Sequence, residues 1–286
     1  MGYAPFPKTV KEFRSRFQDD RACVEQVVQF RWPHGMVCPK CKGRQFWPRT
    51  RRFVYQCQEC LFEVSPKAKT FLHGARVHLR DWFKAAFWLT ESSEPRSAYQ
   101  LQRKLGCSSK TAWHMLHKLR CAMATEDRGP LGGTVEMGDN WSEPDVQAKR
   151  YPLVFGAVAV LNRAPRGERS GRLYLVHVQE PYPFERSWRS LIKHVDYGAR
   201  LKCWPPLGCD LERPIHREYT PHIDRAFKEL RTWLAGYQLA AYPRVPSVYL
   251  PRYLSEFVFK FNRGQTHIES VETLLELACN APPKNV

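Results

Sequence analysis

The sequence predicts an α+β protein of several domains, in which a metal-binding ribbon and a helical segment precede a domain built around a sheet. Three observations support this prediction: two Cys-x-x-Cys pairs near the N-terminus, a helical stretch with an internal glycine turn, and a run of strands followed by helices. The 286 residues are enough for two or three domains. We predict a helical lead-in over 1–30, a zinc ribbon over 31–66, a helix-turn-helix domain over 67–128, and an RNase H-like α/β domain with C-terminal helices over 129–286.

The chain is strongly basic, with a formal net charge of +17. Residues 1–128 contain 24 Lys and Arg against 11 Asp and Glu, a net of +13, whereas residues 129–286 contain 21 against 17, a net of +4. A polyanion is the commonest partner of such a charge, so we expect double-stranded DNA to bind the first half. The sequence has neither an apolar run that could cross a bilayer nor a signal peptide at its start. We therefore expect a cytoplasmic protein without a membrane partner, and a homo-oligomer is allowed.

The cysteine spacing predicts a structural zinc site. Residues 9–30 have apolar side chains at helical spacing, with Thr9 as an N-cap, and lead into the ribbon. Within the ribbon, two Cys-x-x-Cys pairs are separated by fifteen residues that can form a β-hairpin. Four thiolates complete a tetrahedral zinc site and leave no open position for catalysis. The predicted ligands are Cys38, Cys41, Cys57 and Cys60.

A helix-turn-helix pattern follows a predicted aromatic helix at 78–90. In residues 97–122, Gly106 makes the turn, Ser108 or Ser109 caps the second helix, and Ala112, Met115, Leu116 and Leu119 face inward. This leaves Lys110, His114, Lys118 and Arg120 outward. The alternative is an ordinary solvated basic face on a helical hairpin. The predicted DNA-binding residues of the ribbon and the helices are Arg49, Arg51, Arg52, Arg103, Lys104, Ser109, Lys110, His114 and Lys118.

The second half alternates between strand and helix patterns. Apolar, β-branched segments at 134–138, 152–161 and 172–178 predict three antiparallel strands. A helix is expected at 184–195, a short strand at 199–203, and helices at 221–236 and 247–265. Three strands, a helix, a strand and further helices are the element order of an RNase H-like domain.

Five segments in order resemble the IS1595 (ISXO2-like) family of bacterial transposases. They are "RWPHGMVCPKC", "YQCQEC", "HLRDWFKAAFWLT", "SAYQLQRKLGCSSKTAWHMLHKLRCAM" and "YLPRYLSEFVFKFNR". The resemblance implies DNA-binding modules, a location on the bacterial nucleoid, and an RNase H-like domain with two Asp and a Glu or Asn-type third ligand. In the family these ligands hold two Mg²⁺ ions for strand cleavage and joining, so Mg²⁺ is expected only if the protein is catalytically active.

The family's acidic pattern is broken at its first and third positions. The family's first strand reads like Val-Glu-Val-Asp-Glu, but "VEMGD" here places Gly138 where the Asp is expected and Asp139 one residue later. A one-residue shift in a strand aims a side chain at the opposite face unless a bulge intervenes. At the third position Asp224 replaces the longer Glu, and its alternative role is that of a solvated acid near a helix N-terminus.

The second acidic position allows two registers. In one, Asp196 ends a strand "SLIKHV". In the other, "FERSWRSLIKHV" is a helix, "ARLKCW" is the strand, and Cys203 or Trp204 replaces the acid. We favour the second register because it leaves a helix of reasonable length before the strand.

These departures favour a DNA-binding protein that resembles a transposase, including a domesticated one, but is impaired in strand cleavage and transfer. A second hypothesis is an active Mg²⁺-dependent transposase with a rearranged triad of Asp139, Asp196 and Asp224. A third is a protein-interaction scaffold that assembles through the aromatic helices at 78–90 and 247–261.

Overall fold

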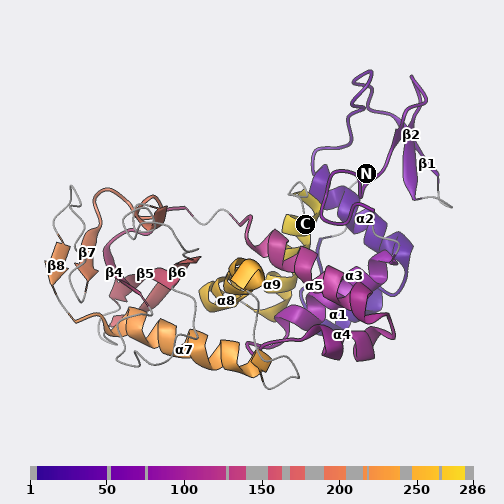
Figure 1. Ribbon diagram of the computed structural model, residues 1–286. Coiled ribbons are helices and arrows are strands. Elements are labelled where there is room, and N and C mark those ends of the chain that lie inside the picture. The colour runs from indigo at the N-terminus through magenta and orange to yellow at the C-terminus, as the bar shows by residue number, and fades with distance from the viewer. Residues whose placement is uncertain are drawn as a thin grey trace. The chain divides into compact units, whose positions relative to one another are not determined.

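A computed structural model describes residues 5–49, 53–74, 77–126, 129–139, 154–162, 168–177, 190–203, 215–217, 219–238, 247–263 and 266–280. The chain divides into two compact units (Figure 1). The first unit contains Met1–Ser92, Arg96–Glu126 and Gln265–Val286. The second contains Ser93–Pro95 and Asp127–Gly264.

Helices and a small sheet make up the first unit. The helices are α1 (Val10–Arg16), α2 (Asp20–Arg31), α3 (Leu79–Thr90), α4 (Ala98–Leu105), α5 (Ser109–Met123) and α9 (His267–Asn280). The sheet is antiparallel, with the order β1 (Phe46–Arg49), β2 (Val54–Cys57) and β3 (Glu63–Val64).

The lead-in predicted over 1–30 contains two helices. The Thr9 side chain caps α1 as predicted, accepting the Glu12 N–H at 3.2 Å. The chain then breaks after Arg16, because the Asp19 carboxylate accepts the Ala22 N–H at 2.9 Å and starts a new helix. A second cap inside the periodic stretch therefore divides it.

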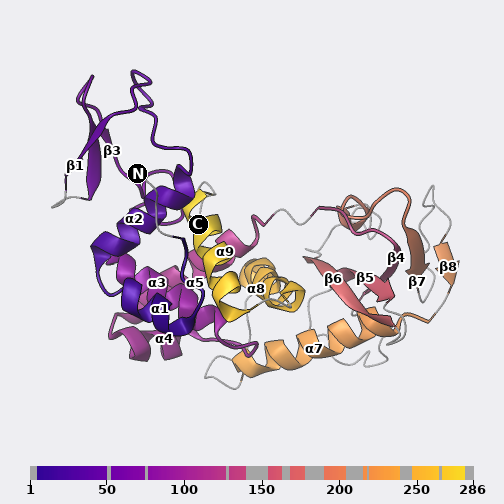
Figure 2. The ribbon, with the colours of Figure 1, turned by 180° about the vertical axis from the view of Figure 1, so that it is seen from behind.

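The last helix of the chain completes the first unit. Helix α9 packs against α2, α3 and α5 (Figure 2), and buries Ile268, Val271, Leu274, Leu275, Ala278 and Cys279. The Phe71 N–H donates to the Ala278 carbonyl at 3.2 Å, and the Asn280 amide donates to the Phe30 carbonyl at 3.2 Å. The C-terminal helices were expected in the domain at 129–286, but α9 belongs to the first unit because its apolar face is buried there.

The second unit contains a five-stranded mixed sheet with the order β6-β5-β4-β7-β8. The three antiparallel strands are β4 (Thr134–Asp139), β5 (Val154–Asn162) and β6 (Glu168–His177), and β7 (Arg200–Cys203) and β8 (Ile215–Arg217) continue parallel to β4. The described residues of this unit also include α7 (Pro221–Gln238), a 3₁₀ turn η1 (Ser247–Tyr249), α8 (Leu250–Asn262) and a helical stretch at residues 190–192.

Described residues on each face of this sheet contribute to a hydrophobic core. Val135 and Met137 of β4 lie in one core, with Leu191, Val195 and Leu201. The other face packs against α7 and α8 through a second core that contains Val154, Val158, Leu173, Ile223, Phe227 and Leu230. Figure 1 shows α7 running along this face. Alternation along β4 therefore decides which residues meet α7.

Residues Ser93–Pro95 join α3 to α4 along the chain, yet they belong to the second unit. The indole N–H of Trp233 donates to the carbonyl of Ser93 at 2.9 Å. The Lys260 ammonium donates to the carbonyl of Glu94 at 3.1 Å. A Cβ atom at Gly236 would lie 2.5 Å from the ring of Pro95. These contacts hold Ser93–Pro95, which we call the strap, against α7 and α8.

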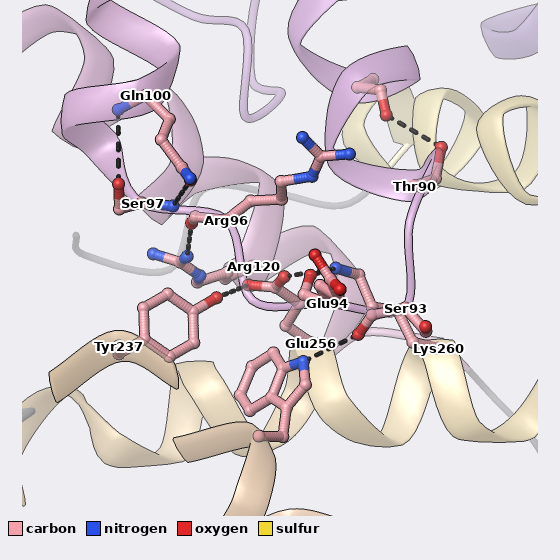
Figure 3. A network of polar contacts seen from close by, with 12 residues as sticks. Thr90, Ser93, Glu94, Arg96, Ser97, Gln100, Arg120, Tyr237, Glu256 and Lys260 are labelled. Carbon is pink, nitrogen blue, oxygen red and sulfur yellow. Dashed lines mark hydrogen bonds and ion pairs between the residues drawn. The ribbon is translucent and has the colours of Figure 1, made fainter. Parts of the chain in front are cut away.

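A buried acid supports this strap. Glu256 is fully buried, with one carboxylate oxygen 2.8 Å from the Lys260 ammonium and the other accepting the Tyr237 hydroxyl at 3.1 Å (Figure 3). Removal of either partner would leave an incompletely paired buried charge. The network therefore holds α7, α8 and the strap in one arrangement.

Candidate metal centre and nucleic-acid surface

Two turns of the same design form the cysteine site. The Lys42 N–H donates to the Cys38 carbonyl at 3.0 Å, and the Leu61 N–H donates to the Cys57 carbonyl at 3.1 Å. Lys42 and Leu61 both have left-handed backbones, with φ of 68° and 59°. Residues other than glycine rarely adopt this region, so each Cys-x-x-Cys pair is closed by a tight and unusual turn.

The four predicted ligands converge. All four sulfur atoms lie within 4.8 Å of one another, with the Sγ atoms of Cys38 and Cys60 separated by 3.5 Å and those of Cys41 and Cys57 also by 3.5 Å. A tetrahedral Zn²⁺ with Zn–S bonds of about 2.3 Å requires sulfur separations of about 3.8 Å. The donor set and its spacing therefore fit structural zinc.

The environment of the thiols is uneven. Desolvation opposes ionisation of Cys38, but the N–H groups of Cys41 and Lys40 and the neighbouring thiols lower the pKa of Cys38 to about 6. At Cys41 the Gly43 N–H favours the thiolate, but desolvation and the other thiols raise the pKa to about 12. A bound Zn²⁺ would deprotonate all four ligands.

Local signals fix the helical pair α4–α5. Ser97 and Gln100 form a reciprocal capping box at the start of α4. Gly106 ends that helix with φ of 67°, a conformation that suits glycine, and Ser108 caps α5 by accepting the Thr111 N–H at 3.1 Å. The predicted inward residues of α5 are buried. The turn and caps of the predicted pattern are therefore present.

Most of the predicted DNA-binding side chains are exposed, as expected. The exposed ones are Arg49, Arg103, Lys104, Ser109, Lys110 and His114. Arg51 and Arg52 lie outside the described residues. Lys118 is half-buried, its ammonium donates to the His73 carbonyl at 3.0 Å, and desolvation lowers its pKa.

Arg120 was predicted to point outward, and this prediction is wrong. Its side chain is buried and donates to the Arg96 carbonyl at 3.1 Å. Both Arg120 and Lys118 satisfy backbone carbonyls within the first unit. The two carbonyls belong to residues 45 and 24 positions earlier in the sequence, so neither charge nor helical spacing reveals these contacts.

The acidic candidates are placed on separate elements. The backbone of Asp139 ends β4 opposite Phe155, and its side chain lies outside the described residues. Asp196 is exposed in a turn, where its carboxylate accepts the Gly198 N–H at 3.1 Å. Asp224 is exposed in the first turn of α7. Within the described ranges, the cysteine site is the sole group of three or more His, Cys, Asp or Glu side chains whose ligand atoms are close enough to hold a metal ion.

The strand register follows the second of the two alternatives. Arg200–Cys203 forms β7, which pairs in parallel with β4, whereas residues 190–192 are helical. Cys203 is buried in the core on the Met137 face. Trp204, which would follow it, lies outside the described residues.

The position of Gly138 is packed against apolar side chains. It pairs with Gly156 of β5, and the two glycines form a flat patch beneath α7. A Cβ at Gly138 would lie 3.3 Å from Ile223 Cγ2 and 3.6 Å from Phe227. At Gly156 the Cβ would come within 2.9 Å of Ile223 Cδ1 and Leu175. An acidic side chain at 138 would thus enter an apolar contact.

Glu136 is a buried residue that the sequence reasoning missed. One of its carboxylate oxygens accepts the N–H groups of His222 and Ile223 at 2.7 and 3.1 Å, and the other contacts His222 Nδ1 at 2.8 Å. Glu136 therefore caps α7 from the neighbouring strand. The available signal was an acid two positions before Gly138, on the strand face opposite Val135 and Met137.

Comparison with protein families gives one match. Residues 18–61 match the transposase zinc-ribbon domain of the IS1595 family. The match includes α2 as well as the cysteine turns, and thus begins before the predicted ribbon boundary at residue 31. No curated protein and no solved structure matches the chain. Among the described residues, no helix combines the length and apolar character needed to span a membrane.

Proposed function

We propose that the protein binds double-stranded DNA as a relative of IS1595-type transposases and is impaired in strand cleavage and transfer. The observation that carries the proposal is the four-cysteine site within a segment that matches a transposase zinc ribbon. Such a protein would act on the bacterial nucleoid. Zinc would stabilise the ribbon, since four thiolates leave no position for substrate.

In this proposal, α4 and α5 form a helix-turn-helix. The capped start of α5 exposes Ser109, Lys110 and His114, as expected of a recognition helix that enters the major groove with its N-terminal residues. Arg103 and Lys104 lie in the last turn of α4, shortly before α5 in the sequence, and both are exposed. We expect Lys118 to contribute less to DNA binding than these residues, because its ammonium already donates to the His73 carbonyl.

We assign the second unit to an RNase H-like domain. The support is its strand order, with three antiparallel strands followed by two strands parallel to the first, and a helix packed on the sheet. In the same proposal, Gly138 occupies the place of the first acid. A carboxylate there would face Ile223 and Phe227 rather than a hydrated metal site.

The remaining acids also favour loss of catalysis. The Asp196 carboxylate closes its own turn, and Asp224 is a solvated acid near the N-terminus of α7. Two Mg²⁺ ions require several carboxylates at short range. We therefore expect no strand cleavage or transfer.

DNA binding is tested with the full-length protein and a duplex, by titration at several salt concentrations. The Lys110→Ala variant should bind more weakly and reduce the salt slope by about 1, as expected for the loss of a phosphate contact. Lys228→Ala, an exposed lysine of α7, is the matched control and should leave both quantities unchanged. Equal affinity of Lys110→Ala and the unsubstituted protein would refute the helix-turn-helix assignment.

The alternative function is an active transposase that uses Asp139, Asp196 and Asp224, and its support is that Asp224 lies on the helix that covers β4. The test is cleavage of terminal-repeat DNA with Mg²⁺ or Mn²⁺. We expect no product. Metal-dependent cleavage that Asp139→Ala abolishes would establish the alternative instead.

A further inference from the structure

We propose that the outer face of the β1–β2 hairpin contacts duplex DNA through Trp47 and Arg49, and that Gln56 positions the Arg49 guanidinium. This inference rests on the proposed DNA-binding function and specifies a surface for it. The three side chains lie on one face of the ribbon. Trp47 and Gln56 are directly paired across the two strands, and Arg49 is two residues beyond Trp47.

The opposite face of the hairpin belongs to the metal site. Cys57 is paired with Phe46, and its thiol lies with the other three sulfur atoms. Strand alternation therefore separates a face that binds metal from a face that is open to a partner. Trp47 is 47% exposed, so its indole is accessible to a partner on this face.

A chain of hydrogen bonds connects the metal-binding turn to Arg49. The Gln56 amide nitrogen donates to the carbonyl of Leu61, the residue that closes the second cysteine turn, at 3.2 Å. The Gln56 amide oxygen accepts from Arg49 Nε at 3.1 Å and from Arg49 Nη2. Gln56 therefore uses both ends of its amide, and the guanidinium is held at the ribbon surface.

This arrangement prepares Arg49 for an anion. Among the described residues Arg49 Nη1 has no partner, so it can donate to a phosphate while Gln56 holds the other two nitrogens. A guanidinium that is already oriented loses less conformational entropy on binding. Gln56 is thus a positioning residue, and it carries no charge of its own.

The distribution of charge favours DNA at this edge. The hairpin sequence "RTRR" at 49–52 contains three arginines and no acid. The nearest acid of the sheet in register is Glu63, which is paired with Gln56 and shares its face, but it belongs to β3 and is separated from the Arg49 strand by β2. A two-stranded ribbon fits the major groove of B-DNA. In such a complex Arg49 would bind phosphate and Trp47 would pack on the groove wall without a charge contribution.

The experiment is a double-mutant cycle on the full-length protein with a labelled duplex. The variants are Arg49→Ala, Gln56→Ala and their combination, with Gln45→Ala as the matched control for an exposed glutamine of the ribbon. Zinc content is measured for each variant to show that the ribbon is intact. Affinity is measured at several salt concentrations, with a single strand of the same sequence as a second ligand.

We expect Arg49→Ala to weaken duplex binding about tenfold and to lower the salt slope by about 1. Gln56→Ala should weaken binding about fivefold and leave the slope unchanged, since the arginine charge remains. The double variant should bind as Arg49→Ala does, because Gln56 acts through Arg49. Trp47→Ala should weaken binding without a change in slope.

Three results would overturn the proposal: additive losses in the double variant, unchanged binding by Gln56→Ala with full zinc content, or a preference for the single strand. If the unsubstituted protein binds duplex while these variants do not weaken it, the hairpin surface is wrong and the DNA-binding function stands. If the unsubstituted protein binds no duplex at all, both are wrong.

Discussion

The cysteine site and the positions that the transposase resemblance assigns to acids differ in how far apart their residues lie in the sequence. The four cysteines occupy residues 38–60 and are presented by two equivalent turns, each closed by a left-handed residue. The positions that the transposase resemblance assigns to acids are spread over β4, β7 and α7. The local site is complete, whereas the distributed one contains glycine and apolar contacts at Gly138. The arrangement of the cysteines depends on two local turns, whereas residues of β4, β7 and α7 come together only if the strands keep their register and the helix packs on the sheet.

The largest expected effect comes from breaking the local site. Cys57→Ser should abolish stoichiometric zinc binding and unfold the ribbon, because structural zinc contributes about 10–16 kcal/mol to such a fold. Metal analysis and amide exchange over residues 38–64 measure this. Cys107→Ser, a free cysteine in the turn before α5, should retain zinc. Full zinc content in Cys57→Ser would show that Cys57 is not a required zinc ligand.

A smaller effect on stability is expected when the helical core of the first unit is changed and the zinc site is left intact. Leu274→Ala in α9 removes a fully buried side chain and should lower the free energy of unfolding of the first unit by about 2–5 kcal/mol. Zinc content should be unchanged. Chemical denaturation provides the measurement, and Glu276→Ala on the exposed side of α9 is the control. Equal stability of the two variants would mean that α9 does not support the helical core.

Within the sheet unit, Glu136→Gln tests the cap of α7. The variant keeps the shape of the side chain but loses one charged acceptor, so we expect a loss of about 1–3 kcal/mol in unfolding free energy. Exchange of the Ile223 amide should accelerate. Glu229→Gln on the exposed side of α7 should change neither quantity. If Glu136→Gln changes neither the unfolding free energy nor the Ile223 exchange rate, Glu136 does not stabilise the start of α7.

Effects of similar or smaller size are expected at the two glycines beneath α7. Gly156→Ala should destabilise the second unit by about 1–3 kcal/mol, since its Cβ would overlap two side chains, and Gly138→Ala should cost less. Gly132→Ala, with no atom within 4 Å of its Cβ, serves as the reference. Thermal unfolding ranks the three. A neutral Gly156→Ala would show that α7 can move away from the sheet, and would reopen the position to a carboxylate.

Features encoded by local spacing could be predicted from the sequence. The cysteine ligands, the caps at Thr9 and Ser108, the turn at Gly106 and the strand pattern of β4 all depend on neighbours in the chain. The periodic stretch at 9–30 concealed the break at Asp19, because apolar spacing continues across the two helices.

Long-range contacts could not be predicted. Arg120 and Lys118 bind carbonyls of Arg96 and His73, and no local pattern reveals those partners. The role of Glu136 depends on the start of α7, which lies 86 residues away. Helix α9 joins the first unit through α2, α3 and α5, whose sequences end long before it begins.

The position of α9 has a consequence for synthesis of the chain. A ribosome adds about 5–20 residues per second, so α9 is synthesised roughly 7–30 seconds after α5 is complete. During this interval α2, α3 and α5 lack the helix that covers them, and their apolar faces are open to chaperones. The cysteine turns, by contrast, are complete once residue 60 has left the exit tunnel and can capture zinc at once. The predicted zinc ligands therefore leave the ribosome well before α9, the helix that completes the core of the first unit.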